Sequence, residues 1–152
     1  MRKRISKNLI DNRNKEKEAL EVYQKALKEL ESNKLSDALS YCKRAKNIDR
    51  NFRPAYKTMG NIFLRAERFK DALDNFQTFL SLSQKANDRI GIEQAYNCLG
   101  SVFGGMGKLD KAVALYSVSI DSAQKRNDNK ALSNYYNNLA LTYRKLQLWK
   151  KA

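Results

Sequence analysis

The sequence has no histidine, a single proline and only six glycines among its 152 residues. Without histidine it lacks the side chain that most often serves as a general base or a zinc ligand near neutral pH. Few prolines and glycines favour long helices joined by tight turns, because these residues most often interrupt helices. No apolar run approaches the roughly 18–20 residues of a membrane span. The composition therefore predicts a helical protein without a metal site, a cofactor or a transmembrane segment.

Cysteine is also scarce, since only Cys42 and Cys98 are present. Their wide separation and the absence of histidine argue against a disulfide framework or a zinc site, so we predict two reduced core residues in a cytosolic or nuclear compartment. Residues 1–7 are basic, but no hydrophobic segment follows them, which argues against a secretory signal. A mitochondrial presequence remains open, although three acidic residues between positions 11 and 18 disfavour it. The predicted location is cytoplasmic.

Charge is the least ordinary property of the composition. Thirty basic and 16 acidic residues give a net charge of +14. Such an excess speeds encounters with anionic partners but does not specify a fold. Two interpretations stay open: a solvated basic surface with a disordered tail, or a surface that binds an anionic ligand.

Three eight-residue blocks, at 56–63, 96–103 and 136–143, share one pattern. Each has an aromatic residue, then a large apolar residue beside a small one, then a second aromatic, at the i, i+3, i+4, i+7 spacing of one helix face. The small residues stand 40 positions apart, at Gly60, Gly100 and Ala140. An alanine follows each of them twelve positions later, at Ala72, Ala112 and Ala152. Small residues facing one another let paired helices approach closely, so the period predicts stacked helical pairs.

We therefore expect an all-α solenoid of antiparallel helix pairs, with seven helices near 13–32, 35–49, 53–66, 69–86, 88–105, 109–126 and 129–146. Turns within the pairs are predicted at Glu67-Arg68, Gly107-Lys108 and Gln147-Leu148. Turns between the pairs are predicted at Asn87-Asp88 and Asn127-Asp128, where each aspartate can cap the next helix. Residues 1–12 are predicted to be a disordered basic segment, and residues 13–152 to be the solenoid.

The third repeat carries a recognisable skeleton of residues, namely Tyr96, Leu99, Gly100, Phe103, Ala112 and Tyr116. This skeleton resembles the tetratricopeptide repeat family, over roughly residues 15–152. The 40-residue period with Asn-Asp at the junctions is similar to the extended repeats of Pins/LGN-type spindle-orientation adaptors and of bacterial signalling proteins. The resemblance implies a right-handed superhelix of three repeats and a truncated fourth, which binds partner proteins in a concave groove.

Each first helix of a pair has a stripe nearly opposite its buried face, and this stripe would line the groove. Its polar members are Lys57, Asn61, Arg65, Gln94, Asn97, Ser101, Asn134, Asn137, Arg144 and Lys145. Asparagine side chains can pair with the backbone of an extended peptide, and the cations can bind carboxylates. We hypothesise that the groove binds an extended acidic segment of a protein partner. Unchanged binding after Asn97→Ala with Asn137→Ala would reject this assignment; the alternative is a polar face that meets only solvent.

Chaperone adaptors of this family hold a C-terminal carboxylate with Lys and Asn on one helix, Asn on the next, and Lys and Arg on the third. Lys57 and Asn61 match the first pair, but the positions that follow are Cys98, Asn134 and Asn138, which do not match. The resemblance therefore does not extend to this carboxylate clamp.

Catalytic motifs are absent from the sequence. There is no nucleophile beside a base and no paired acids with a plausible partner. The run Gly104-Gly105-Met106-Gly107 follows a helix and lacks the Lys-Ser/Thr ending of a phosphate loop, so we interpret it as a frayed helix end. The prediction is a non-enzymatic scaffold.

The rival function is charge-driven binding of nucleic acid or an anionic membrane. The basic cluster at residues 2–7 could contact phosphates, and Tyr135, Tyr136 and Trp149 could stack on bases. These aromatics recur at core spacing, however, and the basic residues do not line one helix face.

The fourth repeat lacks a second helix, so we expect the chain to be a fragment of a longer protein. Helix 129–146 should then leave its face with Leu139, Tyr143 and Leu146 partly uncovered, a possible route to self-association.

Overall fold

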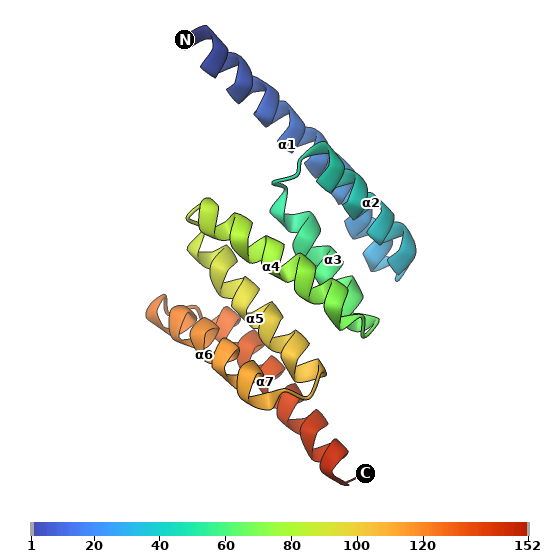
Figure 1. The fold of residues 1–152 in the computed structure, drawn as a ribbon, viewed down its shortest axis with the longest axis vertical. Coiled ribbons are helices and arrows are strands. Elements are labelled where there is room, and N and C mark those ends of the chain that lie inside the picture. The colour runs from blue at the N-terminus through green and yellow to red at the C-terminus, as the bar shows by residue number, and fades with distance from the viewer. Residues whose placement is uncertain (1, 152) are drawn as a thin grey trace.

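The structure is a computed structural model that describes residues 2–151, with side chains described for residues 8–147 and for Lys150. Over this range it consists of seven helices and their connecting turns (Figure 1). The helices are α1 (Arg2–Glu31), α2 (Leu35–Ile48), α3 (Arg53–Arg65), α4 (Phe69–Lys85), α5 (Arg89–Gly105), α6 (Leu109–Lys125) and α7 (Asn129–Lys151). The predicted all-α class and the predicted number of helices are confirmed.

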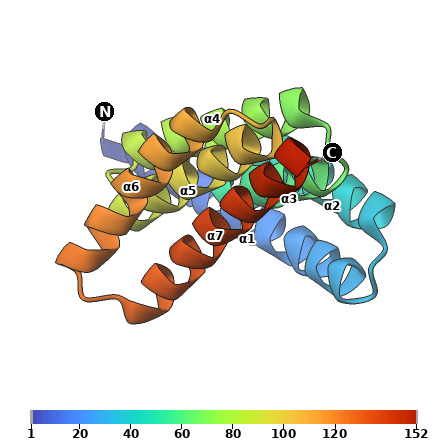
Figure 2. The ribbon, with the colours of Figure 1, turned by 90° about the horizontal axis from the view of Figure 1, so that it is seen from below.

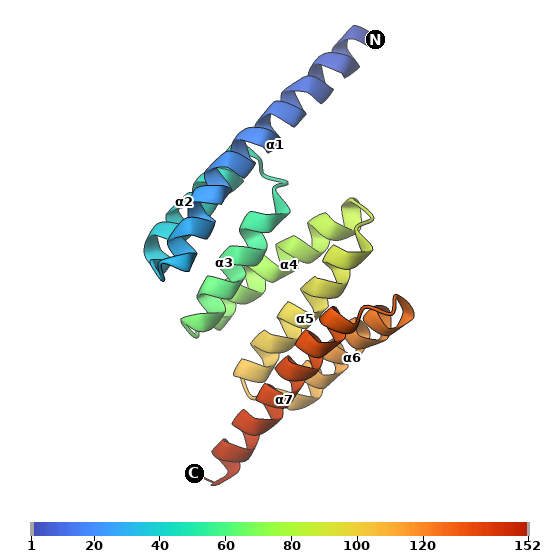
Figure 3. The same ribbon diagram turned by 180° about the vertical axis from the view of Figure 1, so that it is seen from behind.

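The helices form antiparallel pairs that stack side by side. The pairs are α1 with α2, α3 with α4, and α5 with α6, and α7 packs on both α5 and α6. Figure 1 shows α2, α4 and α6 in front, and Figure 3 shows α1, α3, α5 and α7 in front from the opposite side. Seen along the long axis, α4 and α6 form an upper layer and α1 and α7 lie below (Figure 2). This arrangement is the predicted α-solenoid.

The small residues of the repeat sit where two helices cross. A Cβ atom added to Gly60 would overlap the ring of Phe76 on α4, and one added to Gly100 would lie 3.0 Å from the ring of Tyr116 on α6. Glycine therefore permits an aromatic ring to rest on the backbone of the paired helix. Ala140 differs because no paired helix covers it, and it is exposed. The packing prediction is thus confirmed for two of the three small residues.

Five of the six connections between helices share one backbone feature, the exception being residues 49–52 between α2 and α3. Each of the five tight turns contains a residue with φ between 52° and 74°, at Asn33, Glu67, Asn87, Gly107 and Asn127. In each turn the next residue's N–H returns to a carbonyl five residues back, as from Arg68 to Phe63, at 2.8–3.0 Å. This is the helix-ending motif in which a left-handed residue satisfies the last carbonyls.

The predicted aspartate caps are present at the α4–α5 and α6–α7 junctions. Asp88 Oδ1 accepts the N–H of Gly91, and Asp128 Oδ1 accepts the N–H of Ala131, each at 3.0 Å. These bonds are the main reason why the pKa of each carboxyl lies below its ordinary value of 3.8.

The two ends of the solenoid differ from the sequence-based expectation. Helix α1 begins at Arg2, so residues 2–12 continue the helix instead of forming a disordered segment. Residues 8–18 are exposed, and the first buried residue in the described part of α1 is Ala19. Helix α7 runs through Gln147-Leu148, where a turn was predicted, because no glycine or proline lies between 129 and 151. Tyr143 is 45% exposed and Leu139 and Leu146 are half-buried, so this face of α7 is partly uncovered, as expected.

Candidate peptide-binding groove

All ten predicted site residues lie on α3, α5 and α7. These first helices of successive pairs lie side by side on the face seen in Figure 3, and α5 contacts both of the others. We call the surface that carries the ten residues the groove face. Asn61 is exposed on α3, one turn from Lys57 and one turn from Arg65.

One depression on this face gathers four of the predicted residues. It measures about 310 Å³, and among the side chains that line it are Lys57, Gln94, Asn97 and Asn134. We call it the amide depression. Lys57 Nζ donates a hydrogen bond of 2.6 Å to Gln94 Oε1, which joins α3 to α5. The depression therefore places three amides and two cations, Lys57 and Lys130, beside the carboxylate of Asp128.

Asn97 also bonds to α7, but through a residue that the sequence did not predict. Asn138 Nδ2 donates to Asn97 Oδ1 at 3.1 Å. Successive residues of a helix point about 100° apart, so Asn137 faces elsewhere. It lines a depression of about 420 Å³ with Ala140, Leu141 and Arg144, all on α7. Asn97 and Asn137 therefore line different depressions, and part of the predicted amide ladder bonds within the protein.

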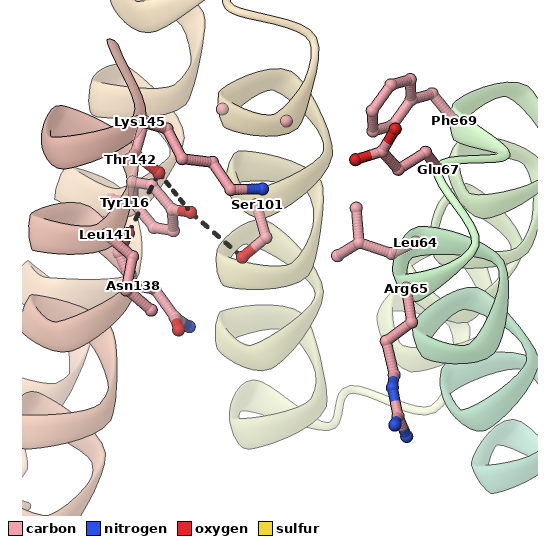
Figure 4. A pocket seen from close by; sticks show the side chains of 12 residues that line it. Leu64, Arg65, Glu67, Phe69, Ser101, Tyr116, Asn138, Leu141, Thr142 and Lys145 are labelled. Carbon is pink, nitrogen blue, oxygen red and sulfur yellow. Dashed lines mark hydrogen bonds between the residues drawn. The ribbon is translucent and has the colours of Figure 1, made fainter. Parts of the chain in front are cut away.

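A second depression lies where the C-terminal ends of α3 and α5 meet α7 (Figure 4). It measures about 320 Å³, and Arg65, Ser101 and Lys145 are the predicted residues that line it. The Lys145 ammonium points toward the middle of this depression, whereas the Arg65 side chain points away (Figure 4). Arg65 Nη2 instead lies 3.4 Å from Asn33 Oδ1, to which it donates. We call this depression the glycine pocket, because Gly104 and Gly105 line it.

Charge is divided unequally between the two layers of helices. Together α3, α5 and α7 contain nine basic residues and one acidic residue, Glu93. The outer helices α4 and α6 each contain two basic and two acidic residues, and α2 contains three basic residues and one acidic residue. Because the single acid of the groove helices is buried and paired with an arginine, these three helices present a positive surface. The net charge of +14 does not by itself reveal on which helices the basic residues lie.

Glu93 is the centre of a polar cluster that sequence reasoning missed. Its side chain is 1% exposed, and its Oε1 accepts from Arg126 Nη2 at 2.7 Å and from the Tyr135 hydroxyl at 2.8 Å. Arg126 Nη1 also lies 3.0 Å from Asp128 Oδ2. The hydrogen bond to Glu93 raises the pKa of Arg126, and burial first, then the bond to Glu93, raises the pKa of Tyr135. The cluster joins α5 to the α6–α7 junction.

Comparing equivalent positions of successive repeats in the sequence could have pointed to this cluster. Arg53 stands 40 residues before Glu93, and Asp88 stands 40 residues before Asp128. In the structure Arg53 pairs with Asp88 across the preceding junction. At the next junction the position of Arg53 is taken by Glu93, and Arg126, whose equivalent is Ala86, bonds to both Glu93 and Asp128.

The two cysteines do not add chemistry to the groove face. Burial raises the pKa of the Cys98 thiol to about 11 and that of Cys42 to about 12, so both thiols stay protonated near neutral pH. Within the described residues, no three His, Cys, Asp or Glu side chains come close enough to hold a metal ion. No helix in this part of the chain combines the length and the apolar character needed to cross a bilayer.

Comparisons with known proteins identify the fold but not a family. No protein-family model matches the sequence, and no curated protein matches it. Among solved structures, the chain is similar to the N-terminal domain of stress-induced protein-1 (STI-1) from C. elegans, with a TM-score of 0.67 and 13% sequence identity. The match covers 82% of this chain and 96% of that domain. The chain is therefore an α-solenoid with a tetratricopeptide-like helical-repeat fold.

Proposed function

We propose that this chain is a non-enzymatic protein-interaction scaffold whose groove face binds an extended, acidic segment of a partner protein. The observation that carries the proposal is the segregation of charge, with nine basic residues and one buried acid on α3, α5 and α7. Cations gathered on one face attract carboxylates and can bind them through charge-assisted hydrogen bonds. The amide depression adds donors and acceptors suited to a peptide backbone.

Within this proposal, two parts of the groove face have different roles. Lys57, Asn134 and the remaining capacity of Asn97 would hold the backbone of the segment near the amide depression. Arg144 and Lys145, both exposed on α7, would bind its carboxylates. The same positive charge on α7 opposes self-association through this helix, because two copies would bring their cations together.

The alternative function is charge-driven binding of nucleic acid or an anionic membrane. Cations gathered on one face would suit either ligand, whereas the amides of the amide depression match a peptide backbone and favour the peptide. Both functions predict weaker binding at high salt, so salt alone does not separate them.

Two charge-matched variants separate these functions. The groove variant combines Arg144→Glu with Lys145→Glu, and the control variant combines Lys70→Glu with Lys125→Glu on the outer helices α4 and α6. Each changes the net charge equally. The probes are a fluorescein-labelled acidic ten-residue peptide, a single-stranded oligonucleotide and phosphatidylserine vesicles. We expect the groove variant alone to lose peptide binding; equal losses in both variants, or binding only to the oligonucleotide or vesicles, would reject the proposal.

A further inference from the structure

The glycine pocket arises from a difference between equivalent positions of successive repeats. The equivalent pairs of adjacent positions recur every 40 residues. They hold Leu64-Arg65 on α3, Gly104-Gly105 on α5 and Arg144-Lys145 on α7. The flanking helices therefore carry long side chains, and the helix between them carries none. The result is a pocket of about 320 Å³ over α5, bounded by α3 and α7 (Figure 4).

Packing against α5 fixes the shape of this pocket. A Cβ atom at Gly104 would lie 2.6 Å from Thr142 Oγ1, and one at Gly105 would lie 2.7 Å from the ring of Phe69. Both neighbours thus rest directly on the α5 backbone, and a side chain at either glycine would displace them. The pocket is built into the contact between repeats and does not depend on a mobile loop.

The chemistry of the pocket favours an apolar occupant. Leu64, Phe69 and Leu141 contribute apolar walls. The hydroxyls of the floor bond to one another, since the Tyr116 hydroxyl donates to Ser101 Oγ at 3.0 Å and lies 3.3 Å from Thr142 Oγ1. A ligand therefore gains little by offering polar groups to this floor and gains most by covering the apolar walls.

Charged residues at the rim of the pocket favour one orientation of the bound segment. Lys145 extends over it from α7, and Glu67 faces it from the α3–α4 turn (Figure 4). A carboxylate beside the occupant is attracted on the α7 side and repelled on the α3 side. Opposite charges at the two sides therefore distinguish the two orientations of an asymmetric ligand.

We propose that the glycine pocket holds one large apolar side chain of the bound segment, of leucine or phenylalanine size, followed on the α7 side by an acidic residue. This inference rests on the proposed function and adds a sequence rule to it. The segment recognised is acidic, with a single apolar anchor, and it has no carboxylate next to Glu67.

The test uses four labelled acidic ten-residue peptides and fluorescence anisotropy. Three peptides differ only in the central residue, which is leucine, phenylalanine or alanine. In each, only one of the two residues next to the centre is acidic. The fourth peptide has the sequence of the leucine peptide in reversed order. Burying a leucine side chain gives at least a tenfold gain in affinity over alanine. We expect the leucine or phenylalanine peptide to bind at least tenfold more tightly than the alanine peptide.

Two variants locate the anchor. Leu141→Ala removes one wall of the pocket, and Val118→Ala removes an equally exposed apolar side chain from α6, since both residues are 46% exposed. We expect Leu141→Ala to abolish the preference for leucine and Val118→Ala to leave it unchanged. Circular dichroism confirms that both variants are folded.

The remaining outcomes separate this inference from the proposed function. If all the peptides bind equally and Arg144→Glu with Lys145→Glu still weakens them, the anchor pocket is rejected and the acidic groove stands. If Glu67→Gln does not improve binding of the reversed peptide, the predicted direction is rejected. If no acidic peptide binds at all, both proposals fail.

Discussion

Removing the hydroxyl of Tyr135 tests whether the Glu93 cluster holds α7 on the solenoid. This hydroxyl donates at 2.8 Å to a carboxylate that is 1% exposed. Tyr135→Phe deletes one oxygen and preserves the ring, while Arg126 keeps its bonds of 2.7 and 3.3 Å to Glu93. A hydrogen bond to a charged group contributes about 1.5–3 kcal/mol, and a buried carboxylate cannot replace it with water. We expect a loss of about 2 kcal/mol in the free energy of unfolding.

The assay combines urea and thermal unfolding, both followed by circular dichroism, with hydrogen exchange. For a domain of this size, about 1 kcal/mol corresponds to a Tm change of roughly 2–4 °C, so the Tm should fall by roughly 4–8 °C. Solenoids lose structure locally, so faster exchange should concentrate in α7 and at the end of α6. Exchange that rises equally in α1 and α2 would mean that the cluster does not act at this junction.

The adjacent residue provides a matched control. The Tyr136 hydroxyl accepts a bond of 3.3 Å from Gln124 Nε2, and its side chain is 47% exposed. Tyr136→Phe should therefore change the unfolding free energy by less than about 0.5 kcal/mol. Equal effects from the two substitutions would refute the assigned role of Glu93.

The same residue predicts a response to alkaline pH. Burial and the bond to Glu93 raise the pKa of folded Tyr135 above its ordinary value of 10.0. A pKa raised by folding stabilises the protein fully below the unfolded pKa, and this contribution is lost as the pH rises above it. Wild-type protein should therefore lose stability above pH 10, and Tyr135→Phe should lose less over the same range in urea titrations.

Four further substitutions test the packing and the turns by urea unfolding. Gly60→Ala should lower the free energy of unfolding by about 2 kcal/mol, because its Cβ would overlap the Phe76 ring. Gly100→Ala should lower it by less than about 1 kcal/mol. Equal losses would contradict the packing geometry. Glu67→Gly should stabilise by about 1 kcal/mol, since Glu67 has φ 56°, and a loss would show that its side chain matters more. Ser83→Ala should be neutral or stabilising by about 1 kcal/mol, because its buried hydroxyl has no hydrogen-bond partner within the described chain.

The sequence predicted the helices and tight turns well in the middle of the chain. A period of 40 residues and two glycines at crossing points determine which faces pair, because a helix buries a stripe at fixed spacing. Left-handed residues and capping aspartates mark the turns, because their chemistry is local. The structure differs from the prediction at residues 2–12, where the expectation came from the basic chain end, and at Gln147-Leu148, where it came from the repeat; no local signal stops a helix at either place.

The sequence by itself thus determined the fold class, the helix pairs and the three helices that bear the groove face. Only the tertiary structure decided that Asn97 pairs with Asn138, that Glu93 is buried beneath Arg126 and Tyr135, and that two glycines open a pocket on α5. The reason is physical. Helix periodicity fixes which face a residue occupies, whereas hydrogen bonds and pockets between repeats depend on how far each helix is rotated and shifted against its neighbour.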